Sequence, residues 1–204
     1  MAKKQKTEED IAAFRARVVE AATRIFVEKG PEQVTMRAIA SELGVSAMTP
    51  YLYFKDRDAI FLAVRLSALT RFADSLEAET EGLDPIAASR AVSSAYTRFA
   101  LGDPMTYRLL FDFGVLRSDE APELSEATQR ARRTMTGYVE RMIEHGIVVG
   151  DATTIGAMFW VAMHGSVMLE LSSTLGDSID PEALRRTLFQ TILAGLRADA
   201  PLSH

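Results

Sequence analysis

Three observations on the amino-acid sequence predict an all-α protein. Apolar residues recur three and four positions apart along most of the 204 residues, and no strand-like alternation persists. Asp-Pro pairs at 84–85, 103–104 and 180–181 have the form of helix starts. Asp caps the first turn in such a pair, and Pro lacks a backbone donor that would have no partner there. Breaks around Gly114–Ala121 and Gly146–Gly150 separate further helical segments.

The first helix illustrates how each segment is assigned. Thr7 precedes three acidic residues, which is typical of a helix start, and Ile11, Phe14 and Val18 fall on one apolar face. Gly30-Pro31 ends this helix near Lys29. The same criteria predict about nine helices, at 8–29, 35–42, 46–53, 56–80, 84–100, 103–112, 121–145, 151–175 and 180–198.

Composition restricts the classes of function. The chain is 48% hydrophobic and 25% charged, as globular proteins are, and it has no cysteine, which excludes disulfides, iron–sulfur clusters and thiol nucleophiles. We find no phosphate-binding Gly-Lys loop, no dinucleotide fingerprint and no His-Glu-x-x-His pair, and the three histidines are scattered. We therefore expect no catalytic site, no metal site and no cofactor. The first ten residues contain no apolar stretch, so we expect no secretory signal and a cytoplasmic protein.

Charge is unevenly distributed along the chain. Residues 1–58 carry a net charge of +1 and residues 59–204 carry −6. Three of the N-terminal positive charges, on Lys3, Lys4 and Lys6, form a short basic arm. This asymmetry suits an anionic partner that touches only the front of the molecule, although a solvated tail would have the same composition.

Residues 35–54 carry the most informative motif. Ile39 and Leu43 give a short helix its buried stripe, and Gly44 can take the left-handed conformation of a tight turn. Val45 fills that turn, and Leu52 and Phe54 return apolar side chains to the core. Two short helices joined by such a turn form a helix-turn-helix. The alternative, left open by the pattern, is a plain helical hairpin.

The predicted second helix presents small, hydroxylic and aromatic side chains outward. Such side chains can contact thymine methyl groups and base edges in a major groove, and hydroxyl and basic groups nearby can bind phosphates. The candidate DNA-binding residues are Thr35, Arg37, Ser46, Ala47, Met48, Thr49, Tyr51, Tyr53 and Lys55.

About fifty residues resemble the N-terminal domain of the tetracycline-repressor (TetR-like) family. The resemblance rests on the run Ala21–Gly30 and, in order and spacing, on Thr35, Ile39-Ala40, Leu43-Gly-Val-Ser46, Thr49, Tyr51, Tyr53-Phe54-Lys55 and Asp58. It implies a homodimeric bacterial transcription factor, usually a repressor, that a small molecule releases from its operator. The family's phosphate or groove-edge contacts fall on Thr35, Arg37, Tyr53 and Lys55, and its base contacts on Ala47, Met48, Thr49 and Tyr51. The run from Phe159 and Trp160 to His164-Gly165 also resembles a Trp…His-Gly signature of one subgroup.

Pro50 departs from the family pattern, in which most members have Leu or a similar residue. If Ser46 caps the second helix, Pro50 removes its first internal hydrogen bond; if Thr49 is the cap, Pro50 stands at the favourable first position. We predict that residues 46–49 form a loosened turn and that regular helix begins near Pro50.

The rear half, residues 56–204, is expected to form a second domain behind an N-terminal domain of residues 1–55. Residues 152–169 contain no charged side chain, so a helix there needs cover on more than one face. A membrane span is disfavoured by Thr153, Thr154, His164 and Ser166 within the run. We expect the last two helices of each subunit to form a four-helix bundle across a two-fold axis, through Leu184, Leu188, Phe189 and Ile192.

Two clusters of aromatic and methionine side chains could line a small-molecule cavity. One contains Met105, Tyr107, Phe111 and Phe113, and the other contains Phe159, Trp160, Met163, His164 and Met168. An ordinary core has the same composition, so the pattern leaves both interpretations open. We expect a small-molecule inducer to bind between the clusters and shift the helix at 56–80. The rival to a DNA-binding regulator is a helical ligand-binding or scaffolding protein without specific DNA binding.

Overall fold

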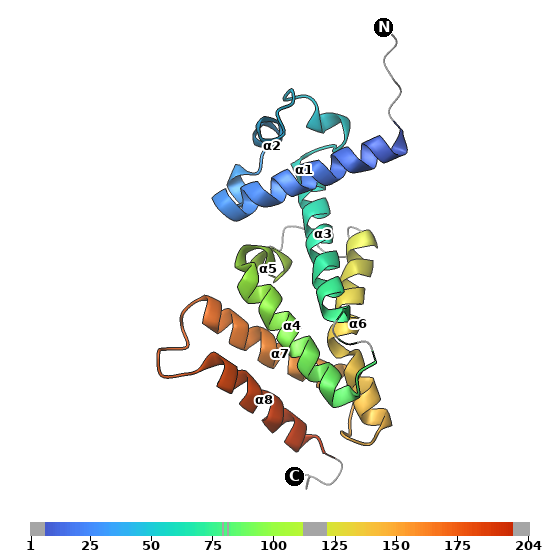
Figure 1. The fold of residues 1–204 in the computed structure, drawn as a ribbon, viewed down its shortest axis with the longest axis vertical. Coiled ribbons are helices and arrows are strands. Elements are labelled where there is room, and N and C mark those ends of the chain that lie inside the picture. The colour runs from blue at the N-terminus through green and yellow to red at the C-terminus, as the bar shows by residue number, and fades with distance from the viewer. Residues whose placement is uncertain (1–6, 79, 81, 112–121, 198–204) are drawn as a thin grey trace. The chain divides into compact units, whose positions relative to one another are not determined.

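The computed structural model describes residues 7–78, 80, 82–111 and 122–197, and the statements below concern those residues. They form eight α-helices and two single turns of 3-10 helix, without a strand (Figure 1). The prediction of an all-α protein is confirmed, with one α-helix fewer than expected. The missing helix is the predicted segment 46–53, where only a 3-10 turn forms.

The helix bounds lie close to the predicted ones. The elements are α1 Glu8–Lys29, η1 Pro31–Gln33, α2 Met36–Glu42, η2 Pro50–Leu52, α3 Arg57–Glu77, α4 Pro85–Gly102, α5 Pro104–Phe111, α6 Pro122–Glu144, α7 Ala152–Leu171 and α8 Pro181–Gly195. Thr7 and Asp10 form a reciprocal capping box at the start of α1. Asp84 and Asp180 accept backbone N–H groups at the starts of α4 and α8, as their Asp-Pro pairs predict.

The chain divides into two compact units. Unit 1 comprises Met1–Leu69 and Met105–Ser125, and unit 2 comprises Thr70–Pro104 and Glu126–His204. The predicted division into residues 1–55 and 56–204 stays a prediction about folding domains.

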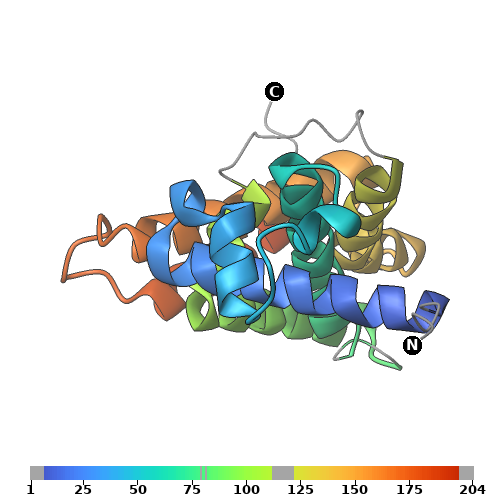
Figure 2. The ribbon, with the colours of Figure 1, turned by 90° about the horizontal axis from the view of Figure 1, so that it is seen from above.

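Unit 1 is built around the apolar face of α1. Val18, Ala21, Ile25 and Phe26 on that face are buried, together with Ile39 of α2. Val18, Ala21 and Ile25 are three and four positions apart and Phe26 follows Ile25, so one side of the helix forms the core. α2 packs against both α1 and η2, which Figures 1 and 2 show from two directions.

Unit 2 is a set of helices in which α7 packs against α4 and α8. Aromatic rings join α6, α7 and α8: the Phe159 ring centroid lies 6.0 Å from that of Tyr138 and 5.1 Å from that of Phe189. Elsewhere in unit 2, Arg130 of α6 donates to Asp74 (2.6 Å) and Glu77 (Nε to Oε1, 3.0 Å) near the end of α3. The hydrogen bond from Arg130 is the main cause that lowers the pKa of Glu77.

α7 has the length and apolar composition of a membrane-spanning helix, which is weak evidence when only one such helix occurs among the described residues. Only 28% of its most apolar window is buried. Met158, Val161 and Leu169 are apolar residues exposed on its outer side. Because residues 152–169 carry no charged side chain, the exposed side of α7 is an uncovered apolar surface.

The crossing of α6 and α7 depends on a glycine, which gives a first prediction. A Cβ on Gly156 would lie 2.7 Å from Cγ2 of Thr136, closer than carbon atoms approach. Gly156→Ala should therefore lower the free energy of unfolding by about 1–3 kcal/mol, as measured by urea denaturation.

Gly137→Ala in α6 is the matched control, because nothing lies within 4 Å of its added Cβ. That variant should gain about 0.5–1 kcal/mol from the lost backbone entropy of glycine in a helix. Equal effects of the two substitutions would contradict the close packing at Gly156.

Candidate nucleic-acid interface and ligand cavity

The first half of the helix-turn-helix motif forms as predicted. Thr35 caps α2 by accepting from Ala38 N at 3.1 Å. Gly44 has a φ of 65°, in the left-handed region that ends a helix without steric cost only for glycine. The following N–H, of Val45, donates back to Ala40 O at 2.9 Å and closes the turn.

The second half is a single 3-10 turn rather than an α-helix. Thr49 N donates to Ser46 O and Tyr53 N to Pro50 O, both with the three-residue spacing of a 3-10 turn, at 2.9 and 3.0 Å. Residues 46–49 form turns, and the helical segment begins at Pro50. The loosened turn at 46–49 and the start near Pro50 agree with prediction. The expected regular α-helix beyond Pro50 is wrong, because only Pro50–Leu52 continue it.

Most candidate DNA-binding side chains lie at the surface of unit 1. Met48 is 69% exposed, Tyr51 is also exposed, and Thr49 and Tyr53 are half-buried. The exposed candidates are Thr35, Arg37, Ser46, Ala47, Met48, Tyr51 and Lys55. The basic arm of Lys3, Lys4 and Lys6 lies outside the described residues.

Two side chains differ from the predicted arrangement. Leu52 was expected in the core, yet it is 74% exposed, and Pro50 is buried instead. Phe54 is buried as predicted. The 3-10 turn has three residues per turn rather than 3.6, so it rotates the side chains relative to an α-helical pattern. Leu52 thereby joins the exposed surface, a position that helical periodicity assigned to the core.

α1 supports the short turn from behind. The Phe14 ring stacks on Tyr53 with centroids 4.3 Å apart, and the Arg15 guanidinium lies 4.1 Å from the centre of the Phe54 ring. Arg15 also donates to the carbonyl oxygen of Tyr53. Tyr53 therefore serves as an attachment to α1, whereas the sequence placed it outward and the family resemblance implied a contact to phosphate or a groove edge.

A second anchor lies just beyond the turn. Arg57 Nε donates to Val34 O at 2.8 Å, and the same guanidinium donates to Pro31 O and lies 4.8 Å from the centre of the Phe61 ring. This one side chain connects the start of α3 to the segment between α1 and α2. From the sequence alone Arg57 would be taken for a surface charge, because the residue pattern does not distinguish it from the charged residues beside it.

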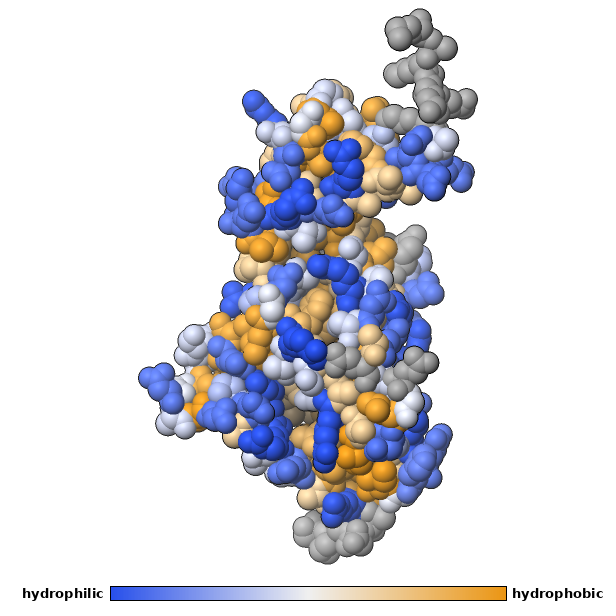
Figure 3. Space-filling view, viewed as in Figure 1, coloured by the Kyte–Doolittle hydropathy of each residue, from blue (hydrophilic) through white to orange (hydrophobic). Residues whose placement is uncertain are grey.

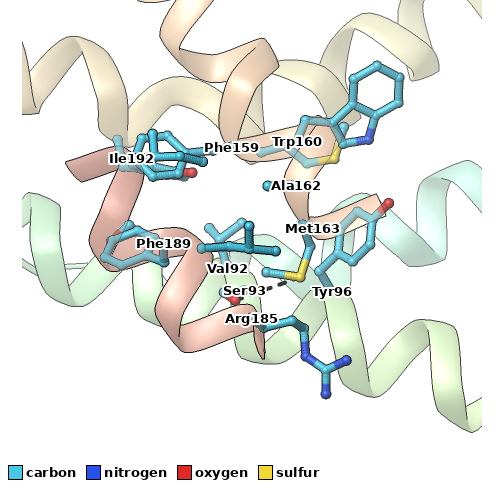
Figure 4. Close-up of a pocket in the computed structure, with 14 residues that line it drawn as sticks. Val92, Ser93, Tyr96, Phe159, Trp160, Ala162, Met163, Arg185, Phe189 and Ile192 are labelled. Atoms are coloured by element: carbon cyan, nitrogen blue, oxygen red, sulfur yellow. Dashed lines mark hydrogen bonds between the residues drawn. The ribbon is translucent and has the colours of Figure 1, made fainter. Parts of the chain in front are cut away.

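An apolar cavity of about 40 Å³ lies within unit 2 (Figure 4). Four helices contribute to its wall, and Trp160 and Met163 of α7 face Tyr96 and Val92 of α4 across it. The complete lining is Ser89, Val92, Ser93, Tyr96, Met135, Tyr138, Phe159, Trp160, Ala162, Met163, Arg185, Leu188, Phe189 and Ile192. Burial raises the pKa of the Tyr138 phenol, so that group stays neutral and adds no charge to the cavity at physiological pH.

The predicted pocket residues divide into two groups. Phe159, Trp160 and Met163 line the cavity. Met105, Tyr107 and Phe111 belong to unit 1 and do not line it, and Phe113 lies outside the described residues. The α4 residues Ser89, Val92, Ser93 and Tyr96 were missed, although their spacing of three and four would have identified them as one face of a helix.

His164 and Met168 lie on α7 but outside the cavity wall. The Nδ1 atom of His164 is 3.2 Å from the Tyr96 hydroxyl, and its ring centroid is 5.8 Å from that of Trp160. His164 therefore holds Tyr96, a lining residue, rather than facing the cavity itself.

The residues predicted for the dimer interface are half-buried within their own chain. Leu188, Phe189 and Ile192 line the cavity of unit 2, and Leu184 is half-buried on the same helix. The apolar side of α8 thus faces inward, and the exposed apolar side chains described above are on α7.

An all-helical chain with a helix-turn-helix-like N-terminal unit and a helical unit that holds an apolar cavity has the architecture of a DNA-binding transcriptional regulator. Two family models agree with this class. Residues 18–64 match the family described as bacterial regulatory proteins, tetR family, and residues 89–192 match the tetracyclin repressor-like C-terminal domain. The chain belongs to the TetR family: it is a transcriptional regulator with a DNA-binding domain, and not an enzyme.

Individual relatives are similar over most of the chain. An uncharacterised HTH-type transcriptional regulator of Mycobacterium tuberculosis, Rv0681, is 25% identical over 89% of this chain and 81% of its own length. The HTH-type transcriptional repressor Rv1474c of the same organism is 30% identical over 62% of this chain and 69% of its own length.

Solved structures share the fold. A protein of unknown function from Rhodococcus sp. RHA1 superposes with a TM-score of 0.80 at 23% identity, covering 96% of this chain and 98% of that one. The transcriptional regulator FadR of Bacillus subtilis, solved in complex with stearoyl-CoA, has a TM-score of 0.69 at 19% identity, covering 89% and 99%.

The attachment of the turn to α1 gives a second prediction. Phe14→Leu removes the ring that stacks on Tyr53, and should lower the free energy of unfolding by about 0.5–1.5 kcal/mol. Because the turn has few hydrogen bonds of its own, amide hydrogen exchange at Tyr53 and Phe54 should become faster. Exchange monitored residue by residue by NMR measures this.

Val27→Ala, at an exposed apolar position of the same helix, is the control and should leave exchange at those two amides unchanged. If Phe14→Leu also left it unchanged, α1 would not be what holds the turn.

Proposed function

We propose that this regulator is a cytoplasmic repressor that binds a roughly palindromic operator as a homodimer and is released by a small molecule bound in unit 2. The exposed surface that carries the proposal is formed by Arg37, Ser46, Ala47, Met48, Tyr51, Leu52 and Lys55. Two-fold symmetry would place two such surfaces in major grooves about one helical turn, or a small multiple of it, apart.

The exposed surface has the chemistry that a duplex requires. Ala47, Met48 and Leu52 offer apolar atoms to thymine methyl groups, and Tyr51 offers a hydroxyl to base edges or phosphates. Arg37 and Lys55 offer charge to phosphates. With a single 3-10 turn instead of a recognition helix, fewer side chains can reach base edges, so specificity would depend on Met48, Thr49 and the residues of the turn.

The homodimer is supported by the outer side of α7. Val161 is 65% exposed, and Met158 and Leu169 are also exposed, with spacings that place all three on one side of the helix. Uncovered apolar side chains in a row are typical of an interface between subunits. The proposed four-helix bundle would therefore use α7 for its apolar contact and the outer side of α8 for polar contact.

The small-molecule role is supported by the apolar cavity in unit 2. Its lining of aromatic, aliphatic and methionine side chains with a few polar groups is typical of ligand sites. The stearoyl-CoA bound to FadR of Bacillus subtilis supports ligand binding by a fold of this kind. Release from DNA would require that the ligand bind the non-operator conformation more tightly than the operator-bound one.

A pair of substitutions separates phosphate contact from base contact. Lys55→Ala should weaken binding to all duplexes about equally and reduce the slope of log affinity against log salt by about 1. Thr49→Ala should instead change the preferred base at one position of each half-site, at a cost of about 1–3 kcal/mol for the original operator. Fragments selected from genomic DNA supply the duplexes, and fluorescence anisotropy over a salt series measures both effects.

Arg132→Ala in unit 2 carries the same charge change as Lys55→Ala outside the motif and should leave both quantities unchanged. Equal loss at operator and scrambled duplexes for Thr49→Ala would refute its role in reading bases.

The dimer surface can be tested by a charge on α7. Val161→Asp would bury a carboxylate in the proposed interface, a cost that no partner offsets, and should give monomers in analytical ultracentrifugation. Val149→Asp, at an exposed apolar position before α7, should remain dimeric. A wild-type protein that is monomeric at tens of micromolar would refute the proposed homodimer directly.

A further inference from the structure

The apolar cavity opens beside a second, larger hollow of different chemistry. A groove of about 950 Å³ lies between α4 and α8, and it shares Ser93, Arg185 and Phe189 with the cavity wall. Both hollows lie within unit 2. The two hollows therefore adjoin at these three side chains.

The groove concentrates positive charge on a part of the chain that is otherwise acidic. Five arginines line it, against one glutamate, while residues 59–204 together carry a net charge of −6. The arginines are Arg90, Arg98, Arg185, Arg186 and Arg197. Figure 3 shows strongly hydrophilic residues gathered over α4 and α8.

Arg185 stands where the two hollows meet. Its side chain is 11% exposed and forms an ion pair with Glu170 of α7. Glu182 lies 3.7 Å from Arg186 and is the one acidic residue in the groove. Each of these two carboxylates pairs with one arginine, and the exposed Arg90 and Arg197 add further positive charge to the groove beside the apolar cavity.

The cavity is small, but some of the side chains in its wall can move. Its volume of about 40 Å³ is far below the roughly 300–1,000 Å³ of typical ligand sites, so a ligand must displace side chains to enter. Met135 and Met163 in its wall are unbranched and can change rotamer at low cost. The sulfur of Met163 accepts weak hydrogen bonds from Ser93 at 3.8 Å (Figure 4) and from Thr97 at 3.5 Å, and both of these residues also line the groove.

We infer that unit 2 binds an amphipathic anion, with its apolar chain in the cavity and a phosphate or carboxylate head in the arginine groove. The planar, forked guanidinium group matches the oxygens of both head groups and keeps its charge at all physiological pH values. The neutral Tyr138 and the aromatic wall suit the chain. This inference names the class of small molecule in the proposed function, and a regulatory role for that ligand rests on the proposed function.

Trp160 makes binding directly measurable. It is the only tryptophan of the chain and it lines the cavity, so a chain that enters should change its fluorescence. Four probes, all kept below the concentrations at which they aggregate, separate the contributions: decyl phosphate, decanoate, decanol and butyl phosphate. Isothermal titration calorimetry on the full-length protein gives each affinity independently of the fluorescence change.

Decyl phosphate or decanoate, whichever has the matching head, should bind at least tenfold more tightly than decanol, which lacks charge, and than butyl phosphate, which lacks the long chain. The order of the two anions then identifies the source of the head group. Equal affinity for decanol and the anions, equal affinity for butyl and decyl phosphate, or no binding of any probe would each overturn the inference.

Substitutions in the groove test where the head lies. Arg90→Gln with Arg197→Gln changes two exposed residues of the groove, and should weaken the tighter anion about tenfold or more while leaving decanol unchanged. Arg132→Gln, exposed on α6 and outside the groove, is the control and should change neither. An unchanged affinity of the double variant, with its thermal unfolding also unchanged, would overturn the inference.

The inference and the proposed function fail separately. Probe binding is measured without DNA, and operator binding is measured without probe. A protein that binds its operator but none of the probes refutes the ligand class alone, whereas one that binds decyl phosphate but no duplex refutes the DNA-binding role alone.

Discussion

The N-terminal unit depends on one constraint, a buried proline in the segment that would otherwise be its recognition helix. Pro50 has no N–H to donate to the preceding turn, although Thr49 before it keeps helical dihedral angles, with φ −63° and ψ −44°. The segment has hydrogen bonds of 3-10 spacing and a single one of α-helical spacing, from Phe54 N to Pro50 O at 3.0 Å, and contacts with α1 also hold its position. The Phe14–Tyr53 stack and the Arg15–Phe54 contact stabilise the turn, where a regular helix would be stabilised by its own hydrogen bonds.

This constraint changes which side chains are available at the surface. An α-helix over residues 46–53 would turn Leu52 inward and Tyr53 outward, whereas the observed turn exposes Leu52 and packs Tyr53 on α1. The exposed row is consequently more apolar than the predicted helix would make it, because Leu52 joins Met48 and Tyr51 at the surface in place of Tyr53. Apolar contact with thymine methyl groups then gains weight relative to hydrogen-bonded readout in the proposed interface.

Local signals in the sequence were sufficient for every predicted helix except the one at 46–53, and insufficient for which helices pack together. Thr7, Asp84 and Asp180 mark helix starts because a cap acts within three residues of itself, and these starts are confirmed. The apolar pattern of α8 was recognised correctly, but it states only that one side is covered and not by what. Phe189 was therefore placed between subunits, and the structure places it against Phe159 of the same chain. Similarly, whether residues of α4 line the cavity depends on which helices pack against α4. Short sequence patterns do not contain this long-range information.

α7 connects the two surfaces that regulation would need. Trp160 and Met163 face the cavity, while Val161, next to Trp160 in sequence, points outward, because successive residues of a helix differ by about 100°. A cavity of about 40 Å³ cannot accept a chain of ten carbons without movement of its walls. Since close-packed helices transmit such movement as small rigid shifts, a ligand that displaces α7 also displaces the apolar row proposed to contact the partner subunit. The ligand changes DNA affinity only to the extent that it binds the two arrangements of α7 with different affinity, so the packing around this helix sets the size of the response.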